Sequence, residues 1–162
     1  MASSYGPLSL WYDTLTGDIP YGEFADFYEA RFNIDGGEFK TLLDLCCGTG
    51  CIGVSLAKLG GFEVTFGDIS PDCLALAREN AALNGVAGSF VLTDMFGNIS
   101  GSYDMICVNP PYIPTSELAS LQAEVKREPA LALDGGADGL DFYRRIARDY
   151  AAHLSPGGAL LM

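Results

Sequence analysis

Short apolar segments alternate with amphipathic segments from residue 41 to the end of the sequence. Apolar runs bounded by Gly, Asp or Asn are typical of parallel strands that are buried on both faces. Apolar residues at helical spacing between these runs are typical of helices that pack on a sheet. Strands are therefore expected at 41–46, 62–66, 89–92, 105–108 and 159–162, and helices at 51–59, 70–84 and 138–153, with a further short helix near 116–126.

This alternation predicts an α/β fold with a doubly wound, mainly parallel sheet and right-handed crossovers. We expect five strands in the order 3-2-1-4-5. The first 40 residues are less regular, and the aromatic residues that follow Pro20 near helical spacing predict a helical segment there. The expected organisation is one domain, with an N-terminal segment at 1–40 and a core at 41–162.

The charge balance argues against a nucleic-acid partner. The chain has 162 residues, with 21 acidic and 9 basic side chains and a net charge of −12. Nucleic-acid binding depends largely on Lys and Arg contacts with phosphates. A protein or small-molecule substrate is therefore favoured.

The N-terminal sequence and the cysteines indicate a cytoplasmic protein. The first residues have neither a charged region nor a long apolar stretch, so no signal peptide is expected. No apolar run reaches the length of a membrane span, so no membrane partner is expected. Five cysteines, an odd number, are typical of free thiols in a reducing compartment. One histidine and no second cysteine pair at ligand spacing argue against a metal site.

The first predicted loop joins an acid to a glycine-rich bend. Gly48, Gly50 and Gly53 match the dinucleotide pattern G-x-G-x-x-G, so NAD is one candidate cofactor. Asp44, just before the bend, would repel a pyrophosphate but can pair with the cationic amino group of S-adenosylmethionine. Its alternative role is to cap the helix or to hydrogen-bond the loop. The pattern favours S-adenosylmethionine over NAD.

Two further acids follow the next strands. Asp68 ends the second predicted strand, 18 residues beyond Gly50. A carboxylate at that position can accept hydrogen bonds from both ribose hydroxyls. Asp94 ends the third strand, where a polar group can meet an adenine amine. Because ligands of such sheets bind at the carboxyl ends of the strands, these acids are candidate cofactor ligands.

The fourth strand ends in Asn109-Pro110-Pro111-Tyr112. The prolines stiffen the loop. The Asn109 side chain and the Pro110 carbonyl offer acceptors that can hold the N–H groups of a planar amide or amine, with Tyr112 against its face. Such a grip turns a weakly nucleophilic nitrogen toward a methyl donor. The alternative is a proline-rich turn with a hydrogen-bonded Asn109.

Residues 44–162 resemble the HemK-type release-factor glutamine methyltransferases, which are class I enzymes dependent on S-adenosylmethionine. The matching stretches are DLCCGTGCIGVSLA, DISPDCLALARENAALNG, YDMICVNPPYIP and EPALALDGGADGLDFYRRI. The resemblance implies transfer to a glutamine in the Gly-Gly-Gln loop of a peptide-chain release factor, with S-adenosylhomocysteine as product. Asn-Pro-Pro-Tyr is shared with adenine and guanine amine methyltransferases, so a nucleobase amine is an alternative acceptor. A non-catalytic fragment that binds the donor is a second alternative.

The resemblance also assigns a role to each candidate residue. The implied donor contacts are Asp44, Cys46, Gly48 and Gly50 at the methionine end, Asp68 at the ribose, and Ile69, Asp94 and Met95 at the adenine. The implied acceptor contacts are Asn109, which also lies beside the donor, with Pro110 and Tyr112.

Both ends of the chain depart from this family. The first 40 residues resemble a different class I group, in which aromatic residues cover the donor. Tyr12 and Tyr21 are the candidates here, and packing of these aromatic residues in the core is the alternative. A class I sheet has seven strands, whereas this sequence stops in the fifth. We therefore hypothesise a chimera or a truncated chain joined near Asp44, and a homodimer through the exposed edge of the fifth strand.

Overall fold

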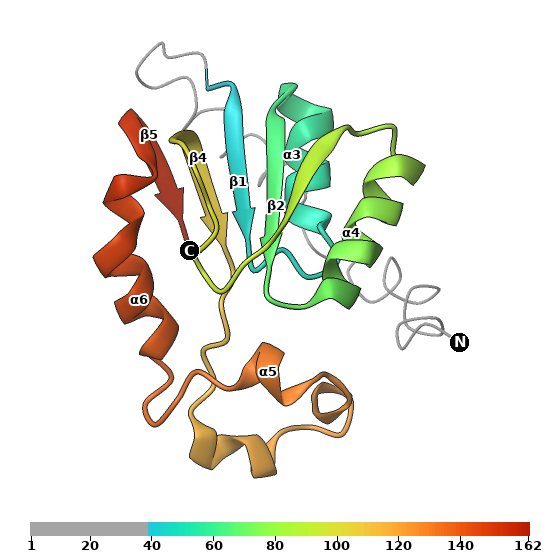
Figure 1. Cartoon of the computed structure of the whole chain (residues 1–162). Coiled ribbons are helices and arrows are strands. Elements are labelled where there is room, and N and C mark those ends of the chain that lie inside the picture. The colour runs from blue at the N-terminus through green and yellow to red at the C-terminus, as the bar shows by residue number, and fades with distance from the viewer. Residues whose placement is uncertain (1–38) are drawn as a thin grey trace. The chain divides into compact units, whose positions relative to one another are not determined.

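The computed structural model describes residues 39–162, which are shown in colour in Figure 1. The chain divides into two units, residues 1–38 and 39–162, and only the second is described below. The predicted N-terminal helix with Tyr21 lies outside the described residues, as does Tyr12.

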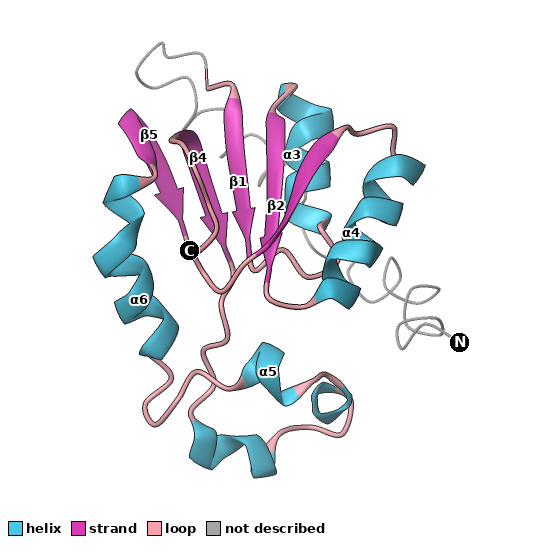
Figure 2. Cartoon of the chain, viewed as in Figure 1, coloured by secondary structure: helices cyan, strands magenta, loops and turns pink. Residues whose placement is uncertain are grey.

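Five parallel strands form one sheet in the order β3-β2-β1-β4-β5, as predicted (Figure 2). Every strand that the sequence predicts is present, although the boundaries differ by up to five residues. The strands are β1 Thr41–Leu45, β2 Glu63–Asp68, β3 Gly88–Leu92, β4 Tyr103–Val108 and β5 Leu154–Leu161.

The helices lie between these strands. The α-helices are α3 Cys51–Gly60, α4 Pro71–Leu83, α5 Ala130–Leu133 and α6 Asp141–Asp149, and the 3-10 helices are η1 Thr115–Ser120, η2 Val125–Arg127 and η3 Tyr150–Ala152. The single short helix predicted near 116–126 is wrong, because two separate 3-10 turns, η1 and η2, occupy this stretch. Neither turn buries a residue, so no apolar face anchors a continuous α-helix there.

The helices cover opposite faces of the sheet. Phe66 of β2 packs against the start of α3, where a Cβ atom on Gly50 would lie 3.3 Å and one on Gly53 2.5 Å from its ring. The other face carries Leu43 and Leu45, which pack with Ile146 of α6. Because side chains alternate along a strand, these two sets lie on opposite sides of the sheet. The sheet is therefore doubly wound, as expected.

The start of α4 is capped by the residues that precede and open it. The Ser70 side chain accepts a hydrogen bond from the Cys73 amide at 3.3 Å, and Pro71 occupies the first turn. This cap places the helix directly after Asp68, which ends β2 as predicted.

The last predicted helix is too long at both ends. It begins at Asp141 rather than Asp138, because Gly139 has a left-handed φ of 77° that a helix does not accommodate. The α-helix ends at Asp149, and η3 follows. Leu154, which the apolar periodicity places on the helix, instead begins β5.

Pro156-Gly157-Gly158, a sequence typical of a turn, lies inside β5. Tyr103 pairs with Leu154, whereas Met105 pairs with Ala159, so β5 bulges between these two pairs. The bulge includes Gly157, whose φ of 81° favours glycine. β5 is the edge strand of the described sheet, and a homodimer through it stays a hypothesis.

Ile146 is the one residue of α6 that is fully buried, with 0% exposure. We expect Ile146→Ala to lower the free energy of unfolding by about 2–5 kcal/mol, because it leaves a cavity between α6 and the sheet. Urea denaturation measures this change. Leu140→Ala, at a side chain that is 47% exposed beside the same helix, is the control and should cost much less. Equal losses would contradict the assigned packing of α6.

Candidate functional site

The loops that follow β1, β2, β3 and β4 leave the sheet side by side, at the carboxyl ends of these strands. This end of the sheet is the edge that carries the candidate site. Leu45 at the end of β1 pairs with Gly67 of β2 and with Val108 at the end of β4. Asp68 at the end of β2 pairs with Leu92 at the end of β3. The loops that carry the predicted site residues are therefore neighbours, and Figure 1 shows the chain beyond β4 extending from this same edge.

The bend after β1 requires its glycines. Gly48 and Gly50 have left-handed φ values of 52° and 75°. A Cβ atom on Gly50 would lie 2.9 Å from the Ala77 Cβ atom of α4, closer than carbon atoms pack. The Asn80 side chain of α4 donates to the Thr49 carbonyl at 2.9 Å. The bend is thus pressed against the neighbouring helix and held there.

Asp44 is a buried residue of β1 whose carboxyl group contacts the start of α3. It is 1% exposed, and Oδ2 accepts a hydrogen bond from the Gly53 amide at 2.9 Å. The predicted alternative, a hydrogen bond to the helix start, is therefore confirmed. Burial raises the pKa of Asp44 to about 7, the bond from Gly53 opposes this rise, and the charge of Asp68 adds to it. In residues 39–162 Asp44 forms no ion pair.

Asp68 holds the glycine bend against the end of β2. Oδ2 accepts from the Gly48 amide and Oδ1 from the Ser70 amide, both at 2.9 Å. Its side chain is buried, and the residue is 7% exposed. A carboxylate oxygen can accept more than one hydrogen bond, so these bonds leave acceptor capacity for a ligand hydroxyl.

Cys46 and Met95 join the first loop to the third. Among the described residues they are the only non-glycine residues with positive φ, at 56° and 53°, and the Cys46 Sγ lies 3.8 Å from the Met95 Sδ. Each left-handed conformation costs roughly 1–2 kcal/mol. Burial raises the pKa of Cys46 to about 12, so its thiol stays neutral. Strained backbone of this kind is typical of binding sites.

Two of the three residues predicted to lie beside an adenine, Ile69 and Asp94, are exposed at the same edge, whereas Met95 is buried. Ile69, directly after β2, is 48% exposed. Asp94 follows β3, and its Oδ1 pairs with Nη2 of Arg145 at 2.7 Å. Sequence reasoning missed Arg145, because it is 51 residues from its partner and no local pattern links them.

The loop after β4 presents a polar side chain on a rigid backbone. Pro110 and Pro111 are buried, whereas Asn109 and Tyr112 are exposed. The Asn109 side chain makes no hydrogen bond within residues 39–162, so the predicted alternative of a hydrogen-bonded Asn109 finds no support there. The amide of Asn109 is therefore accessible to a ligand.

A second segment supports this loop. Ile113 forms a parallel bridge with Asp134, donates from its amide to the Leu133 carbonyl at 2.9 Å and accepts from the Gly135 amide at 2.8 Å. The Thr115 hydroxyl donates to Asp134 Oδ1 at 2.7 Å. Residues 114–133, which include η1, η2 and α5, thus form an excursion that is closed at its base.

Two glycines let the supporting segment approach the backbone of Tyr112 closely. A Cβ atom on Gly135 would lie 2.7 Å from the Cα atom of Tyr112, and a Cβ atom on Gly139 would overlap the Tyr112 carbonyl oxygen. Sequence reasoning noted this stretch only as part of a resemblance and missed its contact with Tyr112. The available signal was the Gly-Gly-x-x-Gly spacing at 135–139.

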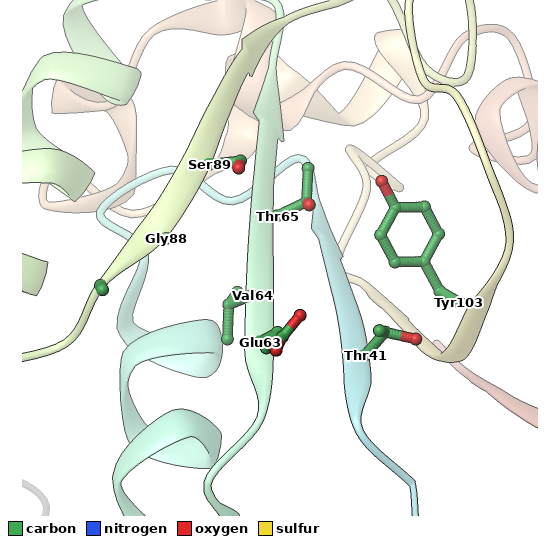
Figure 3. A pocket seen from close by; sticks show the side chains of 8 residues that line it. Thr41, Glu63, Val64, Thr65, Gly88, Ser89 and Tyr103 are labelled. Atoms are coloured by element: carbon green, nitrogen blue, oxygen red, sulfur yellow. The ribbon is translucent and has the colours of Figure 1, made fainter.

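A separate cavity of about 340 Å³ opens on the sheet away from these loops (Figure 3). None of the predicted site residues lines it. Its lining residues come mainly from the first halves of β1, β2 and β3: Thr41, Glu63, Val64, Thr65, Ala87, Gly88, Ser89 and Tyr103.

Within residues 39–162, no cluster of three or more His, Cys, Asp or Glu side chains is placed to hold a metal ion. In the same part of the chain, no helix combines the length and the apolar character needed to span a bilayer.

The family model of the methyltransferase small domain matches residues 31–128. The chain belongs to this methyltransferase family. The match begins upstream of Asp44, and the hypothesis of a chimera joined there stays a hypothesis. The strand order and the family together confirm the predicted Rossmann-like class I methyltransferase fold.

Two relatives of this methyltransferase domain act on glutamine according to their names. The release factor glutamine methyltransferase of Deinococcus radiodurans is 46% identical, over 91% of this chain and 59% of that protein. The ribosomal protein uL3 glutamine methyltransferase of Xanthomonas campestris pv. campestris is 40% identical, over 88% of this chain and 48% of that protein. These similarities support the HemK-type resemblance, although the chain spans only about half of each relative.

A solved methyltransferase from Pyrococcus furiosus has the same fold. Its TM-score is 0.62 at 15% identity, over 98% of this chain and 77% of that one.

The contact between Gly139 and Tyr112 can be tested with a matched glycine. We expect Gly139→Ala to lower the free energy of unfolding more than Gly101→Ala. Both glycines have left-handed φ values, 77° and 81°, but a Cβ atom at Gly101 meets nothing within 4 Å. The left-handed strain is therefore shared, at about 1–2 kcal/mol, and only Gly139→Ala also displaces Tyr112. Urea denaturation measures stability, and hydrogen exchange at residues 112–115 measures loop order. Faster exchange in both variants alike would contradict the contact.

Proposed function

We propose that this methyltransferase domain moves a methyl group from S-adenosylmethionine to the side-chain amide nitrogen of a glutamine in a protein. One observation carries the proposal: the glycine bend and the Asn-Pro-Pro-Tyr loop leave adjacent strands whose last residues, Leu45 and Val108, are paired. A donor on the first loop and an acceptor on the second would therefore be neighbours. Methyl transfer requires little more than that positioning.

The chemistry of the first loop fits the donor. Asp44 and Asp68 are buried carboxylates without an ion pair in the described part of the chain, so a cationic ligand would offset their charge. When bound, S-adenosylmethionine supplies an electrophilic methyl group on a sulfonium centre. NAD fits less well, because its pyrophosphate would meet two buried acids.

We assign the donor contacts as follows. Asp44 would pair with the ammonium group, and Asp68 would accept from the ribose. The methionine end would lie along Cys46, Gly48 and Gly50, and the adenine by Ile69, Asp94 and Met95. Tyr12 and Tyr21 stay candidates outside the described residues.

The Asn-Pro-Pro-Tyr loop after β4 fits a planar amide. The Asn109 side-chain oxygen and the Pro110 carbonyl would accept the two N–H bonds of the acceptor, and Tyr112, which is 56% exposed, would lie against its face. These bonds hold the nitrogen lone pair toward the first loop. The stiff prolines reduce the freedom lost when the acceptor binds. As the N–C bond forms, the C–S bond of the sulfonium would break and release S-adenosylhomocysteine, and the nitrogen would then lose its proton to solvent.

The relatives and the charge favour a protein acceptor. Glutamine is the acceptor in the names of both relatives reported above. The net charge of −12 disfavours a nucleobase in a polyanion. Among proteins we propose a peptide-chain release factor, because the 46% identical relative is named for that substrate.

Donor binding and methyl transfer test the two halves of this proposal. At about 100 times its Kd, S-adenosylhomocysteine should raise the Tm of the chain by roughly 5–10 °C, because it binds the folded state. With labelled S-adenosylmethionine, label should enter a peptide-chain release factor but not a variant whose Gly-Gly-Gln glutamine is replaced by alanine. Labelling of nucleic acid instead, or no change in Tm, would contradict the proposal.

Asn109→Ala separates binding from transfer. We expect it to change the Kd for S-adenosylhomocysteine less than about twofold but to lower transfer to the release factor by about 10²–10³-fold. Isothermal titration calorimetry and the labelling assay measure these quantities. Asn84→Ala, at an exposed asparagine that caps the far end of α4, is the control for the assay. Unchanged transfer by Asn109→Ala would remove this residue from the acceptor site.

Asp44 should make donor binding dependent on pH. Burial raises its pKa to about 7, so at lower pH the carboxyl is protonated and cannot pair with a cation. The Kd for S-adenosylhomocysteine should rise by up to about tenfold per pH unit below 7 and level off above it. Calorimetry from about pH 5.5 to 8.5 measures this profile. Asp44→Asn should bind more weakly and with a flatter profile.

The same group should affect the ligand-free protein in the opposite direction. Its folded pKa lies above the unfolded value of 3.8, so the folded chain holds the proton more tightly. The free energy of unfolding therefore falls as the pH rises from about 4 to about 7. The slope is at most about 1.4 kcal/mol per pH unit. Urea denaturation of the wild type should show this slope relative to Asp44→Asn. Parallel profiles would contradict the shifted pKa.

A further inference from the structure

The backbone around Asp94 is held in a tight turn. The Thr93 hydroxyl donates to the Met95 carbonyl at 2.8 Å and accepts from the Asn98 amide at 3.0 Å. The Gly97 amide donates to the Asp94 carbonyl at 3.1 Å. Thr93 is 3% exposed, so water does not compete for these bonds. The Cα atom of Asp94 is thus fixed, whereas its side chain points outward and is 58% exposed.

A second element holds that side chain. Arg145 Nη2 of α6 lies 2.7 Å from Asp94 Oδ1, and the guanidinium lies 5.7 Å from the centroid of the Phe142 ring on the same helix. The Arg145 side chain is 34% exposed, and its neighbour Ile146 anchors α6 in the core. The Asp94 carboxylate is therefore held by an arginine whose helix, α6, is itself anchored in the core.

Arg145 differs from the other arginines of α6. Arg144 pairs with Asp138 and Asp141, and Arg148 pairs with its neighbour Asp149, so their partners lie within the helix or just before it. Arg145 alone among them reaches a different loop, 51 residues away in the sequence. That loop is the one that carries Met95 to Cys46 at the candidate site.

We propose that Arg145 is a positioning residue for base selectivity. By fixing Oδ1, it would leave Oδ2 of Asp94 to accept a hydrogen bond from the exocyclic amine of an adenine. This inference rests on the proposed function, which places the adenine beside Asp94. A base with a carbonyl in place of that amine would meet the carboxylate oxygen acceptor against acceptor. Selection for adenine over hypoxanthine is the consequence.

The physical reason for a positioning residue is entropy. An exposed aspartate samples several rotamers, and a hydrogen bond to a ligand must first select one of them. A planar guanidinium restricts both the position and the orientation of the carboxylate. Without the guanidinium, Asp94 could turn away from either base. The unfavourable contact with the hypoxanthine carbonyl and the favourable hydrogen bond from the adenine amine would then both weaken.

Calorimetry with two ligands tests this role. S-adenosylhomocysteine carries adenine, and S-inosylhomocysteine carries hypoxanthine and is otherwise identical. The wild type should prefer the adenine ligand. Arg145→Ala should lower the ratio of the two affinities by roughly 3- to 10-fold, which is the range expected for a partly exposed charged hydrogen bond. Arg145→Lys should restore part of the ratio, because it keeps a cation but not the planar group.

Two controls isolate the effect. Arg148→Ala removes a guanidinium from the same helix and should leave the ratio unchanged. Asp94→Ala should lower the ratio at least as far as Arg145→Ala, and the double variant should lower it no further, because both act through one contact. If Arg145 has a purely structural role, Arg145→Ala should weaken the binding of both ligands equally and leave the ratio of their affinities unchanged. That result would overturn the inference.

The outcome also separates this inference from the proposed function. If the chain binds both ligands and Arg145→Ala keeps the wild-type ratio, the positioning role fails while donor binding stands. If the folded chain binds neither ligand, the proposed function fails and the inference fails with it.

Discussion

A buried carboxylate is the constraint on which the rest of the site depends. Asp44 lies almost fully out of contact with water, and in the described residues its one recorded partner is the Gly53 amide. Burying a charge that lacks a counter-ion is unfavourable, and the raised pKa expresses this cost. A ligand with a positive group would remove the cost. The start of α3 contacts this acid through the Gly53 amide, and Asp68 lies close enough for its charge to raise the pKa of Asp44 further.

The neighbouring loops are held to one another rather than standing separately. Asp68 bonds the first loop to the end of β2, and the sulfur contact between Cys46 and Met95 joins the first loop to the third. Two non-glycine residues adopt left-handed backbone at this junction. The contacts between the loops and the packed core of the sheet offset that strain.

Local patterns allowed the sequence to predict most of this arrangement. Apolar runs gave the positions of the strands and of Asp68, because these depend on neighbours in the chain, and the strand order follows from the doubly wound fold class. The parts that were missed depend on distant contacts. Leu154 fits the periodicity of a helix, yet it pairs with Tyr103 in the sheet. Arg145 meets Asp94, and no spacing in the sequence links them.

The closed base of the 114–133 excursion has a consequence for how such domains diversify. Because Ile113 and Asp134 pair and Thr115 bonds Asp134, the segment between them is a loop whose two ends are already tied together. Changes in its length or composition need not be transmitted to the backbone of Asn109 and Pro110. The segment can therefore vary in sequence, or receive an inserted element, without moving the backbone of the loop that follows β4.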